Sequence, residues 1–356
     1  MANMETVFID GSTGEGGGQI LRTSLALSCI TGKKLHIENI RAARRNPGLA
    51  KQHLSCVHAA SQICNGRCQG AALNSKTLDF QPGTVRSGNY NFDIGSAGSA
   101  TLVIQTILPA LFLTDGPSTI TVTGGTHNPL APPFDFLCET FLPAIATAGF
   151  YANCELIKYG FFPAGGGKIT FEILPAIRLV GQPWEKSASG GDRIIDLYRP
   201  TDWLEIHARI YIAKLPAHIA QRQEKLLLQS NLDIRNVEHI EVTDSDGPGN
   251  CVMLRLSGDD RATVFTAFGM KGKPSQQVVS GVVNLAKDFL SSGAAVDRFL
   301  ADQLLIYMAL FKAGCLTTNQ LSAHLLTNME IIKKFLPVAF TTKREKQSYK
   351  ISCQPA

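Results

Sequence analysis

The chain has 356 residues, of which 44% are hydrophobic and 18% charged, a composition typical of a globular protein with one large core or two domains. Its formal net charge is only +5, so any attraction for nucleic acid must come from local clusters of charge and not from the overall field. The longest apolar run, residues 102–113, is broken by Gln105, Thr106 and Pro109 and is too short to span a membrane.

The first predicted elements lie on either side of a glycine-rich loop. Residues 7–9 are predicted to form a strand that ends at Asp10, and an apolar helical period begins at Gln19. A glycine turn between a strand and a helix directs backbone N–H groups toward an anion. The loop matches neither familiar nucleotide-binding fingerprint, so a simple tight turn is an alternative. Glu15 favours a phosphate site, because an acid among such amides needs a metal ion beside it.

One pattern occurs three times, in residues 14–40, 94–123 and 296–316. In each copy an apolar helix with one glutamine precedes a glycine-containing turn, and a second helix follows after a polar loop. Self-similarity of this kind predicts three copies of one packed unit. We therefore predict an α+β or α/β fold in which three repeated αβ units, each with two helices on a small sheet, form a large domain.

A different stretch separates the second and third copies. It opens with a polar run at residues 187–191 that suits a linker. Its alternating residues then predict strands near 204–212, 237–242, 251–257 and 262–268, with helices near 216–228 and 275–290. We predict a smaller inserted α/β domain at residues 184–294, and a large domain made of residues 1–183 and 295–356.

The cysteines and the start of the sequence give an expectation about location. The nine cysteines are scattered and contain no Cys-x-x-Cys pair, and we find no signal peptide ahead of them. We therefore expect reduced thiols in a cytoplasmic or nuclear protein, with cytoplasmic as our assignment.

A basic cluster lies between the predicted strand at residues 35–37 and the helix that follows it. It contains Arg41, Arg44, Arg45 and Lys51. A run of charges is usually a solvated face. The alternative is phosphate binding, because three arginines within five residues of a loop suit bidentate phosphate contacts.

His324 lies where the second helix of the third copy is predicted to begin. A lone histidine is more often structural than catalytic. An imidazole can also act as a covalent nucleophile, and it would suit attack on a phosphorus atom held by a metal ion and backbone amides. His127 and His53 are weaker candidates for this role.

The motifs of the chain resemble those of the RNA 3′-terminal phosphate cyclases, nearly end to end and in the same order. They are Asp10-Gly, Gly14-Glu-Gly-Gly-Gly-Gln-Ile-Leu-Arg22, Ile40-Arg-Ala-Ala-Arg44, Pro47-Gly-Leu, Gln52-His-Leu54, Phe80-Gln-Pro-Gly-Thr84, Ile94-Gly-Ser-Ala-Gly-Ser99, Gly124-Gly-Thr, Asn128-Pro, Ala131-Pro-Pro133, Pro163-Ala-Gly-Gly-Gly167, Asp246-Gly-Pro-Gly-Asn250, Leu300-Ala-Asp-Gln303 and His324-Leu-Leu-Thr-Asn328. The region around 181–203 departs from the family, where this chain is longer.

The resemblance implies an ATP-dependent enzyme that converts an RNA 3′-terminal phosphate to a 2′,3′-cyclic phosphodiester with a divalent metal ion, Mg²⁺ or Mn²⁺. In this family a histidine attacks the α-phosphorus of ATP and forms a covalent histidine–AMP with release of pyrophosphate. AMP then passes to the RNA 3′-phosphate, and the neighbouring 2′-hydroxyl displaces it. The family fold has three repeats similar to the C-terminal domain of translation initiation factor three, with an inserted α/β domain.

By this resemblance His324 matches the nucleophile and Glu15 the metal-binding acid. The positions that match the ATP pocket are Gln105, Pro132, Phe299, Leu300, Ala301, Asp302 and Gln303. The positions that match phosphate-holding residues are Arg22, Arg41, Arg44, Gln52 and His53. Phe299 departs from the family, in which tyrosine is common, so stacking on adenine is kept while a hydroxyl contact is lost. We assign no role to His127.

Two alternatives stay open. A catalytically inactive relative would act as an RNA-binding protein in ribosome assembly, but such a protein would lose the nucleophile and the acid, and both are present. A similar repeat fold also occurs in enolpyruvyl transferases, which need neither ATP nor a histidine nucleophile. The expected partners are RNA with a 3′-terminal phosphate and ATP, with no membrane and no obligate protein partner.

Overall fold

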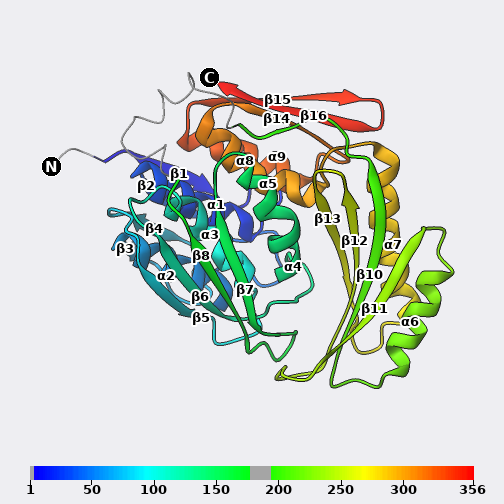
Figure 1. The fold of residues 1–356 in the computed structure, drawn as a ribbon. Helices are drawn as coiled ribbons and strands as arrows, with labels where there is room; N and C mark the ends of the chain where they lie inside the picture. The colour runs from blue at the N-terminus through cyan, green and yellow to red at the C-terminus, as the bar shows by residue number, and fades with distance from the viewer. Residues whose placement is uncertain (1–3, 177–193) are drawn as a thin grey trace.

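The first repeat unit forms a four-stranded sheet in the computed structural model, which describes residues 4–176 and 194–356 (Figure 1). Its strand order is β1-β2-β4-β3, with β1 parallel to β2 and the other neighbours antiparallel. The elements are β1 (Thr6–Asp10), α1 (Gly18–Thr31), β2 (Lys34–Glu38), α2 (Lys51–Cys64), β3 (Arg67–Gln69) and β4 (Leu78–Gln81). Gly32, at φ 71°, ends α1 in the left-handed conformation that glycine adopts without strain.

The second and third units repeat this topology, with strand orders β5-β6-β8-β7 and β9-β14-β16-β15. The second unit contains β5 (Asn89–Asp93), α3 (Ala100–Leu111), β6 (Ser118–Gly124), α4 (Phe134–Phe136), the π-helical segment Leu137–Phe141, α5 (Leu142–Ala146), β7 (Ala152–Lys158) and β8 (Gly167–Ile173). The third contains β9 (Asp196–Leu197), α8 (Arg298–Phe311), β14 (Gly314–Thr318), α9 (Ala323–Phe335), β15 (Val338–Glu345) and β16 (Ser348–Pro355). In both units the first two strands are parallel.

A fourth sheet, β11-β10-β12-β13, lies to one side of the three units (Figure 1). Its elements interrupt the third unit between β9 and α8. They are β10 (Trp203–Ala213), α6 (His218–Leu228), β11 (Ile234–Val242), β12 (Gly249–Gly258), β13 (Ala262–Phe268) and α7 (Ser275–Ser292). Helices α6 and α7 cover one face of this sheet and bury a hydrophobic core of their own with it.

The three repeat units share one hydrophobic core, because their helices lie between the sheets (Figure 1). Leu21 of α1, Leu108 of α3, Leu304 of α8 and Ile332 of α9 are all fully buried in it. Helix α1 packs against α3 and α9, and α8 packs against α9. This packing brings the N-terminal turns of α1 and α9 together at one place.

The predicted fold class is confirmed, with repeated αβ units and an additional α/β sheet. The strands and helices predicted between residues 204 and 290 are confirmed within a few residues. The domain boundaries at 183/184 and 294/295 stay a prediction, and the first of them lies outside the described residues, as does the predicted linker at 187–191. No helix in the described part of the chain is both long and apolar enough to cross a membrane.

The expectation that all cysteines are reduced thiols is wrong for one pair. Cys138 in the π-helical segment and Cys154 in β7 form a disulfide, with Cα atoms 6.4 Å apart, and the other seven cysteines are free. The packing of this helical segment against β7 brings together two residues that are 16 positions apart. No local motif marks such a tertiary pair in a sequence.

Candidate active site

The glycine-rich loop between β1 and α1 packs against the first turns of α9. Gly14 and Gly16 have φ values of 57° and 55°, a conformation that other residues rarely adopt. The backbone N–H of Glu15 donates to the hydroxyl of Thr327 over 3.0 Å. Helix α1 begins without a side-chain cap, so its first backbone N–H groups have no side-chain acceptor and can bind an anion.

Glu15 projects from this loop into a nearly closed position, with its side chain only 4% exposed. Its Oε2 accepts a hydrogen bond from Arg44 over 2.7 Å, whereas its Oε1 is buried without a hydrogen-bond partner. A buried carboxylate oxygen without a partner is costly and suits a bound cation. Within residues 4–176 and 194–356, no three His, Cys, Asp or Glu side chains gather into a metal site. A divalent ion at Glu15 would therefore need phosphate and water oxygens, which suits Mg²⁺.

His324 lies in the first turn of α9, beside Glu15. Ser322 caps this helix by accepting a hydrogen bond from the N–H of Leu325, so the position of the turn is fixed. The imidazole is 49% exposed, and its Nδ1 lies 3.7 Å from Oε2 of Glu15. Nδ1 makes a 2.6 Å hydrogen bond with Oε1 of Gln19. An accessible histidine with one anchored nitrogen can act as a nucleophile through the other.

Gln19 and Asp302 join His324 to the interior. The Nε2 group of Gln19 donates to Oδ1 of Asp302 over 2.6 Å, and Asn328 donates to the same oxygen over 3.2 Å. Burial raises the pKa of Asp302 to about 6, although these hydrogen bonds oppose the shift. The sequence motifs included Gln19, but no functional role was predicted for it. Asp302 was predicted as part of the ATP pocket.

The predicted basic residues occupy different environments. Burial lowers the pKa of Arg22, which lies in the field of Glu15 and Asp302 and remains charged. Arg41 adopts a positive φ of 57° and donates to the carbonyl oxygen of Gly48 over 2.7 Å. Arg44 is 46% exposed and pairs with Glu15. The structure thus links Arg44 directly to the glycine-rich loop and anchors Arg41 in its own loop.

Gln52 and His53 lie in the first turn of α2, a second helix without a side-chain cap. Oε1 of Gln52 accepts a hydrogen bond from the N–H of Ser99, which connects α2 to the start of α3. His53 is buried, and burial together with the nearby arginines lowers its pKa to about 3. His53 is therefore neutral at physiological pH and can offer a phosphate an N–H group but no charge.

Because His53 is buried and neutral, we expect the free energy of unfolding to fall in acid. The unfolded chain protonates His53 below its ordinary pKa of 6.5, whereas the folded protein does not until about 3. Stability is therefore lost as the pH falls through this window, by up to about 1.4 kcal/mol per pH unit and about 2.5 kcal/mol between about pH 7 and about pH 4.5. Urea unfolding of wild type and His53→Gln at both pH values measures this difference, which we expect the variant to lack.

His58 provides the matched control, because it lies on the same helix and is exposed. We expect His58→Gln to keep the pH dependence of the wild type. An equal acid sensitivity in wild type and His53→Gln would contradict the buried, neutral state of His53.

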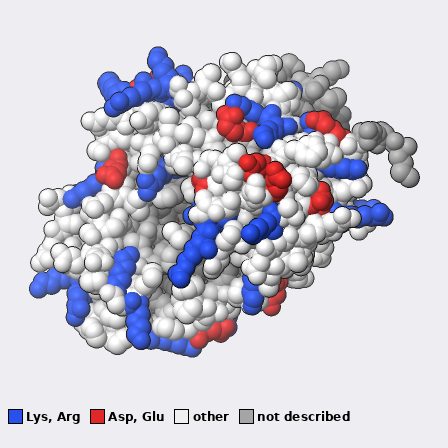
Figure 2. All heavy atoms as spheres, turned by 180° about the vertical axis from the view of Figure 1, so that it is seen from behind, with Lys and Arg blue, Asp and Glu red and all other residues white. Residues whose placement is uncertain are grey.

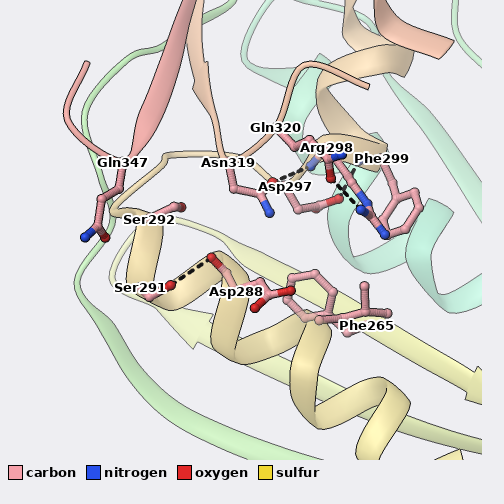
Figure 3. A pocket seen from close by; sticks show the side chains of 11 residues that line it. Phe265, Asp288, Ser291, Ser292, Asp297, Arg298, Phe299, Asn319, Gln320 and Gln347 are labelled. Carbon is pink, nitrogen blue, oxygen red and sulfur yellow. Dashed lines mark hydrogen bonds between the residues drawn. The ribbon is translucent and has the colours of Figure 1, made fainter. Parts of the chain in front are cut away.

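Phe299 lies in the first turn of α8, and the residue is 43% exposed. Arg298 covers one face of this ring at 4.8 Å from its centre and also hydrogen-bonds Gln320 (Figure 3). Beside them a cavity of about 450 Å³ opens toward Asp288 and other residues of α7 and β13. An exposed aromatic ring at the rim of such a cavity suits stacking of a planar base.

The other residues predicted for the ATP pocket lie along α8 and α3, except for Pro132 in the loop before α4. Leu300 and Ala301 are buried in the core, so they pack α8 and do not face solvent. Gln105 of α3 hydrogen-bonds Gln303, which also donates to the carbonyl oxygen of Phe299 over 3.1 Å. The carbonyl oxygen of Pro132 accepts a hydrogen bond from Thr101 of α3 over 2.7 Å. Gln303 is the residue after Asp302 in α8, so its contacts with Gln105 and Phe299 lie next to the hydrogen bonds of Asp302.

His127 lies outside this group of residues. It is fully buried, and its Nε2 lies 2.7 Å from a carboxylate oxygen of Asp135. Asp135 also accepts a hydrogen bond from the hydroxyl of Tyr211 in β10 over 2.7 Å. His127 therefore helps to attach the fourth sheet to the second unit.

The face opposite to that of Figure 1 is hollowed, and lysine and arginine side chains stand around the hollow with fewer acidic ones (Figure 2). The formal net charge of the chain is +5. Such a local excess of positive charge attracts an anionic polymer even when the overall charge is small.

Comparisons with known proteins agree along nearly the whole chain. The sequence model of one protein family, described as RNA 3′-terminal phosphate cyclase, matches residues 13–342. The chain is 40% identical over 343 residues to a protein named RNA 3′-terminal phosphate cyclase from Salmonella enteritidis, covering 96% of this chain and 97% of that one. Proteins of the same name from Ralstonia nicotianae and Koribacter versatilis are 41% and 42% identical over 347 and 352 residues, covering 97% and 98% of this chain and 96% and 95% of theirs.

Proposed function

Because this chain belongs to the RNA 3′-terminal phosphate cyclase family, we propose that it uses ATP to convert the 3′-phosphate at an RNA end to a 2′,3′-cyclic phosphodiester through a covalent histidine–AMP. One observation carries this proposal. The accessible imidazole of His324 lies 3.7 Å from the buried carboxylate of Glu15, at the uncapped start of α1. A nucleophile, an acid for a metal ion and free backbone amides are the groups that adenylylation by ATP needs.

In the first step, His324 attacks the α-phosphorus of ATP. Nδ1 is engaged with Gln19, so Nε2 carries the lone pair that forms the new P–N bond. The bond from the α-phosphorus to the bridging oxygen breaks, and pyrophosphate leaves. The free N–H groups at the start of α1, together with Arg22, stabilise the negative charge that builds up on the phosphates.

Glu15 would hold the divalent metal ion, Mg²⁺ or Mn²⁺, through the buried oxygen that has no other partner. The bound ion would supply charge neutralisation at the phosphate oxygens. Phe299 stacks on adenine in this proposal, and Gln105, Pro132, Gln303 and Asp302 line the same part of the site. Leu300 and Ala301 act by holding α8 in place.

The second and third steps act on the RNA. An oxygen of the 3′-phosphate attacks the phosphorus of the histidine-bound AMP, the P–N bond breaks, and a diphosphate linkage joins RNA and AMP. The 2′-hydroxyl then attacks the RNA phosphorus, loses its proton, and displaces AMP. Arg41, Arg44, Gln52 and the neutral His53 hold the RNA phosphate in this proposal.

The alternative is an RNA-binding relative without catalysis. His324 and Glu15 are side by side here, which favours the enzyme. We further propose that the protein acts in the cytoplasm, since seven of the nine cysteines are free, and that RNA and ATP are its partners.

Incubation with ATP labelled at the α-phosphate, with Mg²⁺ or Mn²⁺ and a 3′-phosphorylated RNA, tests the proposal. We expect labelled protein before RNA is added, and RNA with a 2′,3′-cyclic end, AMP and pyrophosphate afterwards. RNA binding without either product would favour the non-catalytic alternative, and no use of ATP or RNA would favour a small-molecule transferase.

Glu15→Gln should raise the metal concentration needed for self-adenylylation by about tenfold or more, because the neutral amide is a much poorer ligand for a divalent ion. A direct measurement of Mn²⁺ binding by electron paramagnetic resonance checks the same point without turnover. Glu5→Gln is the matched control, since Glu5 is exposed, pairs with Lys33 and lies at the opposite end of β1 from the glycine-rich loop. A metal titration unchanged from wild type would leave Glu15 as a turn residue only.

A further inference from the structure

A chain of hydrogen bonds leads from His324 into the core between α1, α8 and α9. Nδ1 of His324 bonds Oε1 of Gln19 over 2.6 Å, and Nε2 of Gln19 donates to Oδ1 of Asp302 over 2.6 Å. Asn328 donates to Oδ1 and to the backbone oxygen of Asp302 over 3.2 and 3.0 Å. Thr23 in turn donates to Oδ1 of Asn328 over 2.8 Å. Each member is therefore held by at least one neighbour on a different helix.

The chemistry of these groups fixes the direction of every hydrogen bond. An ionised carboxylate only accepts, so Asp302 can bond the amide nitrogen of Gln19 but not its oxygen. The amide oxygen of Gln19 must then face His324, and an amide oxygen also only accepts. Nδ1 of His324 therefore carries the hydrogen. The lone pair of the neutral ring is left on Nε2, because Gln19 and Glu15 both lie against Nδ1.

Glu15 competes for the same nitrogen but is held away from it. Its Oε2 lies 3.7 Å from Nδ1, beyond hydrogen-bonding distance, while Arg44 bonds that oxygen over 2.7 Å. Gln19, and not Glu15, therefore orients the imidazole. This separation leaves Glu15 available to a cation.

We propose that Gln19 and Asp302 are positioning residues that fix the tautomer and orientation of His324 for attack by Nε2 and stabilise the charged ring that results. The proposal rests on the proposed function of the site. When Nε2 forms the P–N bond and pyrophosphate leaves, the ring keeps its Nδ1 hydrogen and carries one positive charge. Oε1 of Gln19 accepts a hydrogen bond from this N–H, and the negative charge of Asp302 lies on the other side of the Gln19 amide. When AMP passes to RNA, the P–N bond breaks and its electrons return to Nε2.

The hydrogen-bonded series Asp302–Gln19–His324 would orient the imidazole as the aspartate does in the aspartate–histidine pair of hydrolases. Here an amide lies between the acid and the imidazole. In such systems an imidazole held in the wrong tautomer retains its position but loses its reactive lone pair. A structural role for Gln19 would affect folding without changing which ring nitrogen carries hydrogen. The tautomer is therefore the readout that separates the two roles.

Nitrogen-15 NMR of the histidines, at a pH where the ring is neutral, tests the first part. We expect hydrogen on Nδ1 of His324 in the wild-type protein and a mixture of tautomers in Gln19→Met, which keeps the length of the side chain without its acceptor. His324→Gln identifies the signal. A wild-type His324 with hydrogen on Nε2 would overturn the proposal.

Single-turnover self-adenylylation tests the second part. Gln19→Met should slow it by about 10²- to 10⁴-fold, the range seen when a catalytic histidine loses its orienting partner, with little change in the ATP concentration at half-saturation. If wild type does not label with AMP, the proposed function fails. If wild type labels with AMP and Gln19→Met labels equally fast, the positioning role of Gln19 is wrong and the proposed function is still supported.

Exchanging the amide and the carboxylate between positions 19 and 302 tests whether the rate of self-adenylylation can be restored. Gln19→Glu alone places two carboxylates in contact in the core, and the repulsion between their like charges disfavours this arrangement. The double variant Gln19→Glu with Asp302→Asn restores a donor against an acceptor at both contacts. We expect the double variant to adenylylate at least about tenfold faster than Gln19→Glu alone, because one buried like-charge pair is removed. A double variant that folds and is no faster would overturn the role of Asp302, and the NMR result on wild type still decides that of Gln19.

Discussion

His324→Ala is expected to abolish the protein–AMP adduct, reducing its formation by about 10⁴-fold or more, because in the proposed mechanism His324 supplies the lone pair that attacks the α-phosphorus. The fold should survive the change. His324 is half exposed in the first turn of α9, and the Ser322 cap of that helix does not depend on it. Alanine is also the best helix former at such a position. Labelling with α-phosphate-labelled ATP and a metal ion measures the adduct, and the melting temperature reports the fold.

His218→Ala is the matched control for this variant. His218 is likewise an exposed histidine at the start of a helix, but this helix, α6, covers the fourth sheet and is not one of the helices that carry the site residues. It should label like the wild type. The adduct itself should be labile in acid and stable in base, as expected of a phosphoramidate. Labelling of His324→Ala at the wild-type rate would remove His324 from the chemistry.

The repeat pattern predicted most of the fold, because the periodicity of apolar residues is a local signal. The helices that begin at Gly18, Ala100 and Arg298 were expected from three similar apolar runs, and the strand predicted at residues 35–37 follows the first of them. The shared strand order of the three sheets could not be predicted in the same way. It depends on which edges pair in space, and β9, only two residues long, carries too little pattern to be recognised.

The site residues also fall into those that the sequence could identify and those that depend on tertiary packing. Glu15 and His324 stood out by residue type and motif, and the packing of α1 against α9 brings them within 3.7 Å of each other. Gln19 was visible as the one glutamine of its repeat helix and as part of a motif, but nothing local shows that its two amide atoms connect His324 to Asp302. The neutral state of His53 also depends on tertiary burial beside three arginines. A sequence shows which groups are present but not which of them are desolvated.

The loss of both Arg41 and Arg44 should weaken cyclisation of a 3′-phosphorylated RNA by about 10²- to 10⁴-fold. A terminal phosphate monoester carries nearly two negative charges, and each charged hydrogen bond contributes about 1.5–3 kcal/mol. Self-adenylylation should fall much less. Arg44 touches Glu15 and therefore has some effect there, whereas Arg41 is anchored in the loop before α2. Rates of the two half-reactions, measured separately, check this difference.

The choice of substitutions follows from the backbone. Arg41 has a φ of 57°, so alanine would strain the loop, whereas asparagine tolerates that conformation; the variant is therefore Arg41→Asn with Arg44→Ala. Arg45→Ala is the control, because Arg45 is exposed in the same loop and was not assigned to the phosphate.

The double variant should also flatten the salt dependence of RNA binding by roughly 0.7 in slope for each lost contact. Equal damage to both half-reactions would instead assign these arginines to the triphosphate, and damage to neither would make them a solvated face.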